Sequence, residues 1–465
     1  MTQAQSSPAS SSKIATLEEA RAFFAANPEV DAVDIIFTNM SGVPRGKRLR
    51  QHEVLAVYES GRFLPGSVLV IDITGRDTEE TGLVWEDGDA DRYCLPVPGT
   101  LVRAPWLGEH AAQFTTSFYE LDHTPSDLDP RHVLGRVVDR LEAEGLTPVV
   151  AVELEFFLLE AGNGKPVIAR GLKSGERPSS NEVYSLREME DFKPFFDDLY
   201  AACDVQGIPL ESGISEYAPG QFELTLRHKP DALRATDDAV MYKRLVKGVA
   251  AQHGMIASFM AKPFAEQAGS GMHLHVSMAD RSGANAFASE DPEGSPLLRH
   301  AIGGMKELLG ESMAIFAPNA NSFRRFKANS YAPVAPTWGV NNRTVSLRVP
   351  AGSPASRHVE HRICGADANP YLAVAAVLAG MHHGMTGKID PGPAITGNGY
   401  EQAPEDYRLP NHWADAIEAF KTSSRMRDYL GDRFVTHFCT VKEVEMARFF
   451  GEVTELDYAW YMHNA

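Results

Sequence analysis

Several residue types and motifs are scarce in this chain of 465 residues, and each shortage excludes a class of protein. Only four cysteines occur, and they lie far apart, without a CxxC pair, at positions 94, 203, 364 and 439. They offer neither zinc-ligand spacing nor a disulfide framework, which fits a reducing compartment. The 44 basic residues are outnumbered by 62 acidic ones, and the resulting net charge of −18 disfavours nucleic acid or an anionic membrane as the main partner.

Long apolar runs are also missing. The longest helix-like run, Leu372 to Met381, is too short to span a bilayer. The first residues, MTQAQSSPASSSK, lack the apolar stretch of a signal peptide, and we expect residues 1–14 to form a disordered tail. The sequence therefore predicts a cytoplasmic protein with no membrane partner and no nucleic-acid partner.

Common nucleotide-binding and hydrolase motifs are absent as well. The chain contains no GxxxxGK[ST] loop, no GxGxxG after a strand, no HExxH and no GxSxG. If the protein uses ATP, metals and arginines must hold it.

The pattern of apolar residues predicts an α+β fold with two domains. Residues 15–125 combine a short helix with short apolar runs between Gly and Pro, as in a small strand-rich domain. Asp129-Pro130 then begins a helix, and from residue 126 onward strands alternate with long helices, such as 231–253 and 370–383. We expect Trp413 and Trp460 to anchor the core of this second domain.

The strongest chemical signal is a set of predicted strands whose polar residues share a face. Glu153 and Glu155 are two residues apart in an otherwise apolar strand, so both side chains point the same way. An exposed acidic edge strand would give the same pattern. A second pair favours a functional site: if Pro219-Gly220 forms a two-residue turn, Glu216 lies opposite Glu223, at a distance of roughly 5 Å between Cβ atoms. Like charges so placed require a cation.

Two further strands add to the same site. After the loop Gly269-Ser270-Gly271, His273, His275 and Ser277 share one strand face. In the second strand, Glu360 and Arg362 share a face. Five carboxylates with one or two imidazoles and no thiolate favour Mg²⁺ or Mn²⁺ over zinc, and magnesium sites commonly bind substrate phosphates. Downstream arginines could hold a carboxylate and phosphates through bidentate contacts; they are Arg324, Arg325, Arg343, Arg348 and Arg362.

These segments, in this order, resemble the glutamine synthetase family. The resemblance runs from about Val33 to the C-terminus, and its matching stretches are 152–157, 216–223, 269–277, 321–325, 341–350, 360–362 and 368–372. It implies an N-terminal β-grasp domain over residues 15–125 and a catalytic domain with a curved antiparallel sheet over residues 126–465. It also implies a homo-oligomer, usually two stacked hexameric rings, and an ATP-dependent ligase that activates L-glutamate as γ-glutamyl phosphate for attack by an amine.

The resemblance assigns roles residue by residue. Glu155, Glu216 and Glu223 would bind one metal, and Glu153, His273 and Glu360 another, with two or three Mg²⁺ or Mn²⁺ ions per site. Gly269, Arg325 and Arg362 would hold glutamate, and Arg343 would contact both substrates. ATP, the co-substrate, would be held by Glu211, His275, Ser277, Arg343 and Arg348. Our candidates for catalysis are Arg343, Arg362 and Tyr331.

The chain departs from ammonia-using members at the amine site. Those members carry a glutamate in the loop after the Asn-Ser-aromatic-basic-Arg motif, where this chain has Tyr331, and an aspartate in an Asp-Gly-Ser segment whose nearest match here is Pro65-Gly66-Ser67. A phenol is uncharged at pH 7 and cannot replace the missing carboxylate. These departures, together with the segments 331–333, 338–343 and 364–367, resemble the γ-glutamylpolyamine synthetase branch of the family. Members of that branch glutamylate putrescine or spermidine in polyamine catabolism.

Alternatives remain open at this stage. The amine could be a monoamine or ethanolamine, the protein could be an ammonia-using glutamine synthetase in which Tyr331 is tolerated drift, or it could be a catalytically silent structural or regulatory relative.

Overall fold

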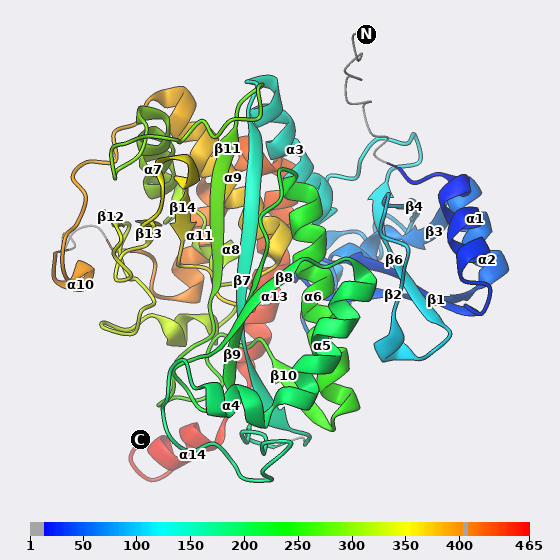
Figure 1. The fold of residues 1–465 in the computed structure, drawn as a ribbon, viewed down its shortest axis with the longest axis horizontal. Coiled ribbons are helices and arrows are strands. Elements are labelled where there is room, and N and C mark those ends of the chain that lie inside the picture. Colours follow the sequence, from blue (N-terminus) through cyan, green and yellow to red (C-terminus); the bar gives the residue numbers. More distant parts are fainter. Residues whose placement is uncertain (1–13, 163, 403–407) are drawn as a thin grey trace, which may run out of the picture.

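The computed structural model describes residues 14–162, 164–402 and 408–465. The expected disordered tail lies almost entirely outside these residues. Two sheets organise the chain, and in Figure 1 the smaller one, in blue and cyan, lies beside the larger one. Within the described residues, no helix is both long and apolar enough to cross a membrane.

The N-terminal sheet has six strands in the order β2-β1-β6-β4-β3, with β5 added along β6. β1 pairs with β6 in parallel and with β2 antiparallel. Two helices complete this part, α1 (Leu17–Ala26) and α2 (Gln51–Ser60). The strands are β1 (Ala32–Thr38), β2 (Pro44–Arg50), β3 (Arg62–Pro65), β4 (Asp91–Pro96), β5 (Val102–Arg103) and β6 (Ala111–Tyr119).

The larger sheet has eight strands in the order β12-β13-β14-β11-β7-β9-β8, with β10 added along β7. It is antiparallel except for the β12–β13 pair, and the long strands β7 and β11 cross its middle in Figure 1. The strands are β7 (Thr147–Glu160), β8 (Leu210–Ser215), β9 (Gln221–Leu226), β10 (Met255–Ser258), β11 (Met272–Ala279), β12 (Trp338–Val340), β13 (Leu347–Val349) and β14 (Val359–His361).

Helices surround this sheet and form most of the C-terminal part. The first, α3, begins at Pro130 with Asp129 as its cap, as the sequence predicts. The helices are α3 (Pro130–Ala143), α4 (Leu186–Asp191), α5 (Lys193–Gln206), α6 (Ala232–Gln252), α7 (Pro296–Leu308), α8 (Met313–Phe316), α9 (Pro370–Gly387), α10 (Gly399–Gln402), α11 (Trp413–Thr422), α12 (Ser424–Leu430), α13 (Asp432–Gly451) and α14 (Glu455–Tyr461).

The core of the larger part is built on α9, which is buried along most of its length. Gly304 of α7 and Gly384 of α9 let these two helices touch backbone to backbone, because a Cβ on Gly304 would lie 2.2 Å from the Gly384 nitrogen. The predicted α+β architecture is confirmed. Trp413 is buried as expected, whereas the expectation for Trp460 is wrong: it is 57% exposed, on a helix with no buried residue.

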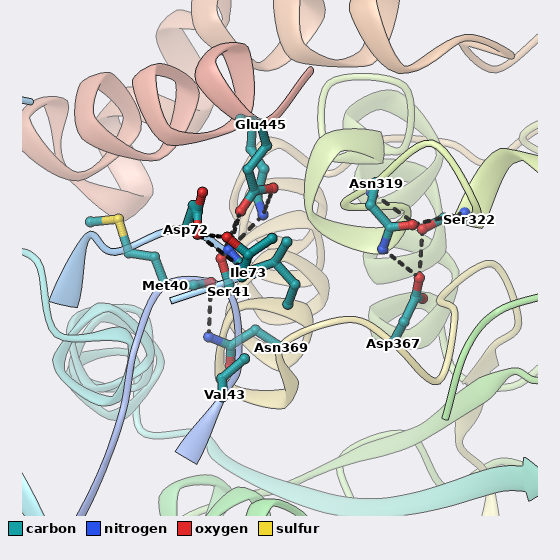
Figure 2. Close-up of polar contacts among 12 residues, drawn as sticks. Met40, Ser41, Val43, Asp72, Ile73, Asn319, Ser322, Asp367, Asn369 and Glu445 are labelled. Carbon is teal, nitrogen blue, oxygen red and sulfur yellow. Dashed lines mark hydrogen bonds and ion pairs between the residues drawn. The ribbon is translucent and has the colours of Figure 1, made fainter. Parts of the chain in front are cut away.

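Polar contacts join the two parts of the chain. Figure 2 shows the Glu445 carboxylate of α13 accepting hydrogen bonds from the Ile73 amide (2.7 Å) and the Ser41 hydroxyl (3.3 Å). In the same view, the Asn369 side chain donates to the Met40 carbonyl at 3.3 Å. Arg244 of α6 reaches Asp34 of β1 at 2.7 Å. The division into residues 15–125 and 126–465 stays a prediction.

Candidate active site

Acidic and imidazole side chains line one face of the larger sheet as opposed pairs. Across the β7–β9 ladder Glu155 lies opposite Glu223, and across β7–β11 Glu153 lies opposite His273. Across β11–β14, His275 lies opposite Glu360. Because side chains alternate between faces along a strand, the pairs that follow each other at a spacing of two residues share one face. The predicted common face of β7, β9, β11 and β14 is thus observed.

The hairpin that carries Glu216 differs from the prediction. β8 ends at Ser215 and β9 begins at Gln221, so the loop has five residues rather than two, and Glu223 pairs with Ile214 instead of Glu216. A Pro-Gly turn splays a hairpin, and the longer loop accommodates it. Glu216 nevertheless reaches the site from the loop, because its carboxylate groups with those of Glu155 and Glu223.

Among the described residues, three sets of side chains could each hold a metal ion, with ligand atoms within 4.8 Å of one another. Glu155, Glu216 and Glu223 form one set, the same three that the sequence assigned to one metal. The other predicted trio is divided: His273 joins Glu153 and Glu223, while Glu360 joins Glu153 and His275. His273 Nδ1 still lies 3.9 Å from Glu360. His275, which the resemblance assigned to ATP, lies 3.2 Å from Glu153.

The electrostatics of this face fit a divalent cation. Burial and the charge of Glu216 raise the pKa of Glu155 to about 7, and burial with four neighbouring carboxylates raises that of Glu223 well above its ordinary value. Burial opposes ionisation of Glu153 too, but hydrogen bonds from His273 and His275 outweigh it and lower its pKa. The oxygen-rich set would attract a hard cation such as Mg²⁺ or Mn²⁺, which would relieve this repulsion.

Two arginines flank Glu360. Arg348 Nη1 lies 2.8 Å from the Glu360 carboxylate, and Arg362 forms a second ion pair with it. Burial opposes ionisation of Glu360, but the positive charges around it, Arg362 foremost, hold its pKa at about 2. The Nε atoms of both arginines are buried and lack a hydrogen-bond partner within the described part of the chain. Each guanidinium thus has one buried donor that is not satisfied by the described residues.

Two of the four predicted glutamate-binding residues, Gly269 and Arg325, lie against each other. Arg325 lies against Gly269, where a Cβ would be 2.3 Å from its Cγ, and its Nη1 donates to the Ile363 carbonyl at 2.9 Å. Figure 2 shows the Asp367 carboxylate accepting from the side-chain amide of Asn319 (2.8 Å) and from the Ser322 hydroxyl (2.6 Å). Ser322 begins the short helical turn Ser322–Arg325, so these contacts support the segment that carries Arg325. The position of Arg325 is therefore fixed by its neighbours.

The remaining candidates lie nearer the surface. Arg343 is exposed, and its charge acts on Glu216, where it partly offsets the rise that burial causes in the pKa of that carboxyl. Tyr331 is 64% exposed with a φ of 57°. Glu211 on β8 forms an ion pair at 2.8 Å with Arg227, the residue that follows β9, and Ser277 lies on β11 opposite Val149. The roles that the sequence assigned to these residues stay predictions.

Comparisons with known proteins identify the family of this chain. The model of the glutamine synthetase catalytic domain matches residues 127–461. The chain belongs to the glutamine synthetase family. Among family members, the chain is 40% identical to the gamma-glutamylputrescine synthetase PuuA of Escherichia coli K12, over 96% of this chain and 95% of that protein.

Other similar family members bear names of other glutamate–amine ligases. A glutamate–isopropylamine ligase of Pseudomonas sp is 32% identical, over 93% of this chain and 95% of that protein. The gamma-glutamylethanolamide synthetase of Streptomyces coelicolor is 33% identical, over 94% of each chain. Among solved structures, GmaS in complex with ADP matches with a TM-score of 0.83 at 26% identity, over 96% of this chain and 99% of that one.

Sequence reasoning missed the residues that support the ligand set. Gln221 donates to the Gly269 carbonyl at 3.0 Å and so ties the start of β9 to the glycine loop. Asp367 supports the turn of Arg325, and Glu188 contacts the Glu216 loop. All three act through contacts between segments distant in sequence. Only Glu188 had a local signal, its spacing from Ser185, which is typical of a helix start.

Proposed function

We propose that this protein is an ATP-dependent glutamate–amine ligase that joins a polyamine, such as putrescine or spermidine, to the γ-carboxylate of L-glutamate. The single observation that carries the ligase activity is the face of paired carboxylates and imidazoles beside buried arginine donors. The similarity to the putrescine enzyme, and a tyrosine rather than a glutamate at position 331, favour a polyamine over ammonia.

In the first step, the γ-carboxylate oxygen of glutamate would attack the γ-phosphorus of ATP, and the bond to the ADP oxygen would break. Gly269, Arg325 and Arg362 would hold glutamate by its charged groups, and Arg343 would contact both substrates as charge moves between them. Arg348, Glu211, His275 and Ser277 would hold the nucleotide. The protein's own glutamate and histidine side chains would hold two or three Mg²⁺ or Mn²⁺ ions, whose charge would neutralise the phosphate oxygens of ATP.

In the second step, the neutral amine nitrogen would attack the γ-acyl carbon, and the bond to phosphate would break. The amine loses one proton before the attack and another as the amide forms. The intermediate must be kept from water, because hydrolysis would return glutamate. Tyr331, in the loop after Arg325, is our candidate for a contact with the amine.

The family resemblance also bears on the assembly and the location of the protein. We propose a cytoplasmic homo-oligomer of two stacked hexameric rings, as the resemblance implies. A second candidate function, ligation of a monoamine or ethanolamine, is favoured by the relatives named for isopropylamine and ethanolamide formation.

The direct test measures phosphate release with each component omitted in turn. With Mg²⁺, ATP, L-glutamate and putrescine together, release should exceed every omission, and omitting the metal should abolish it. A panel with spermidine, ethanolamine, isopropylamine and ammonium then ranks the amines by kcat/KM. Release that is independent of glutamate would exclude a glutamate–amine ligase, and release that no amine stimulates would favour a silent relative.

A further inference from the structure

The loop that carries Glu216 has little of its own to orient that carboxylate. The loop spans residues 216–220 between β8 and β9. The Glu216 carboxylate accepts a hydrogen bond from the backbone amide of the next residue, Tyr217, at 3.1 Å. Glu155 and Glu223 form the same candidate metal set, and the charges of Glu153 and Glu216 act on one another. The direction of Glu216 is therefore determined by the backbone of its loop.

Glu188 of α4 holds both ends of this loop. Its Oε2 accepts a hydrogen bond from the Ser215 hydroxyl at 2.7 Å, and its Oε1 accepts one from the Gly220 amide, also at 2.7 Å. Ser215 is the last residue of β8, and Gly220 is the residue before β9. The Glu188 side chain is 8% exposed, so both hydrogen bonds are shielded from water.

The local sequence around Glu188 is typical of a different hydrogen-bond partner for its carboxylate. Ser185 and Glu188 have the spacing of a capping box, in which the glutamate side chain turns back to the amide of the capping residue. Ser185 does cap α4, accepting from the Glu188 amide at 3.3 Å, but the Glu188 carboxylate bonds the distant loop instead. The Glu188 side chain therefore connects α4 to the 216–220 loop rather than capping its own helix.

The helix that presents Glu188 is itself fixed against the hairpin. The Tyr184 amide donates to the Ser215 carbonyl at 2.9 Å, just before α4 begins. After α4, the ring of Phe192 packs edge-on against Phe222 of β9, with centroids 5.3 Å apart. Since α4 is attached at both of its ends, Glu188 acts as a rigid clamp across the loop.

We propose that Glu188 is a positioning residue, which clamps the 216–220 loop so that Glu216 stays beside Glu155 and Glu223 to complete a metal site. This inference rests on the proposed function, because it assumes that those three carboxylates bind a divalent ion. Partners that orient metal ligands typically contribute 10- to 100-fold to metal affinity. The clamp thus acts on metal binding and through it on catalysis.

The test measures Mn²⁺ binding without substrates, by electron paramagnetic resonance of free Mn²⁺, in the wild type and two variants of Glu188. Glu188→Ala removes both acceptors and should weaken one class of Mn²⁺ sites by about tenfold. Glu188→Gln keeps an acceptor for the Gly220 amide and can donate to the Ser215 oxygen, so its Mn²⁺ affinity should equal that of wild type. Glu190→Ala is the matched control, because Glu190 is exposed on the same helix and pairs only with Lys173 among described ion pairs.

Two outcomes would overturn the clamp. One is unchanged Mn²⁺ affinity in Glu188→Ala, and the other is an equal loss in Glu188→Gln, which would mean that charge rather than hydrogen bonding matters. If Glu188→Ala does not fold, Ser215→Ala removes one of the two contacts, and its Mn²⁺ affinity should fall by about threefold; no change there would also overturn the proposal.

A kinetic measurement separates positioning from general damage. In Glu188→Ala the Mg²⁺ concentration for half-maximal rate should rise about tenfold, while kcat at saturating Mg²⁺ and the KM for ATP stay near wild type. A fall in kcat that saturating Mg²⁺ does not restore would contradict the clamp. If the wild type binds Mn²⁺ but no amine supports phosphate release, the ligase proposal fails and the clamp still stands on the binding data.

Discussion

Glu155 of β7 and Glu223 of β9 lie directly opposite each other in an antiparallel ladder. Carboxylates so placed repel, and desolvation with the charge of neighbouring carboxylates raises the pKa of each above its ordinary value. A divalent cation bound between the two carboxylates would relieve their repulsion. Because a metal and a proton compete for the same carboxylates, metal binding should depend on pH.

Metal affinity should depend on pH through Glu155. Its pKa of about 7 means that the carboxyl is largely protonated in the metal-free protein below that pH, and a metal must displace the proton. We expect Mn²⁺ affinity, measured by calorimetry, to fall by up to about tenfold per pH unit between about pH 7 and about pH 6.

The same shift has a consequence for stability. Because the pKa of Glu155 is raised on folding, the metal-free folded state binds more protons than the unfolded state between the ordinary value of 4.5 and about 7. The free energy of unfolding should therefore decrease as pH rises through this window. Glu155→Gln should flatten this dependence in thermal melts of metal-free protein; an unchanged slope would remove Glu155 as its cause.

Gly269→Ala should weaken glutamate binding selectively. A Cβ at this position would lie 2.3 Å from Arg325 Cγ and 2.7 Å from the Ala261 carbonyl, so Arg325 must move. Overpacking of this kind costs about 1–3 kcal/mol, and we expect the KM for glutamate to rise at least about fivefold. Gly135→Ala, where a Cβ meets nothing within 4 Å, is the control and should leave kinetics unchanged. Equal kinetics in both variants would disprove the contact.

Asp367 should control glutamate affinity through the turn of Arg325. Asp367→Ala leaves the side-chain amide of Asn319 and the Ser322 hydroxyl without their acceptor. The KM for glutamate should therefore rise about fivefold to tenfold, while the KM for ATP is unchanged. Asp367→Asn keeps an oxygen that can accept both hydrogen bonds and should stay near wild type. Steady-state kinetics with each substrate varied distinguish these outcomes; a matching rise in the KM for ATP would show a general defect instead.

Tyr331→Glu should shift the choice of amine. A carboxylate at this position supplies the negative charge that a small ammonium ion needs, and one hydrogen bond to a charged group contributes about 1.5–3 kcal/mol. We expect kcat/KM for ammonium to rise by about tenfold or more relative to putrescine. Tyr331→Gln, which is polar but uncharged, is the control. If both variants behave alike, charge at residue 331 does not select the amine.

Local patterns in the sequence predicted much of the fold and the candidate ligands. The alternation around Glu153 and Glu155, and around His273 and His275, placed these side chains on one face because strand periodicity is fixed by backbone geometry. Asp129-Pro130 predicted the start of α3 for an equally local reason.

Features set by contacts between distant segments were not predictable in this way. The loop length at Glu216 depends on how Pro219-Gly220 fits between β8 and β9, and the turn prediction was wrong there. The Ser185–Glu188 spacing is typical of a helix start, but nothing local reveals that the Gly220 amide lies near the Glu188 carboxylate. Trp460 shows the same limit: an aromatic residue in a helical pattern does not disclose whether anything packs against it.

The most direct test of the proposed activity is a competition between amines. The protein is incubated with ATP, Mg²⁺, L-glutamate and equal concentrations of putrescine and ammonium, and the products are quantified by mass spectrometry. We predict that γ-glutamylputrescine exceeds glutamine by at least about tenfold, as expected if the site disfavours a small cation by more than about 1.4 kcal/mol. A product mixture dominated by glutamine would contradict the assignment of a polyamine as the substrate.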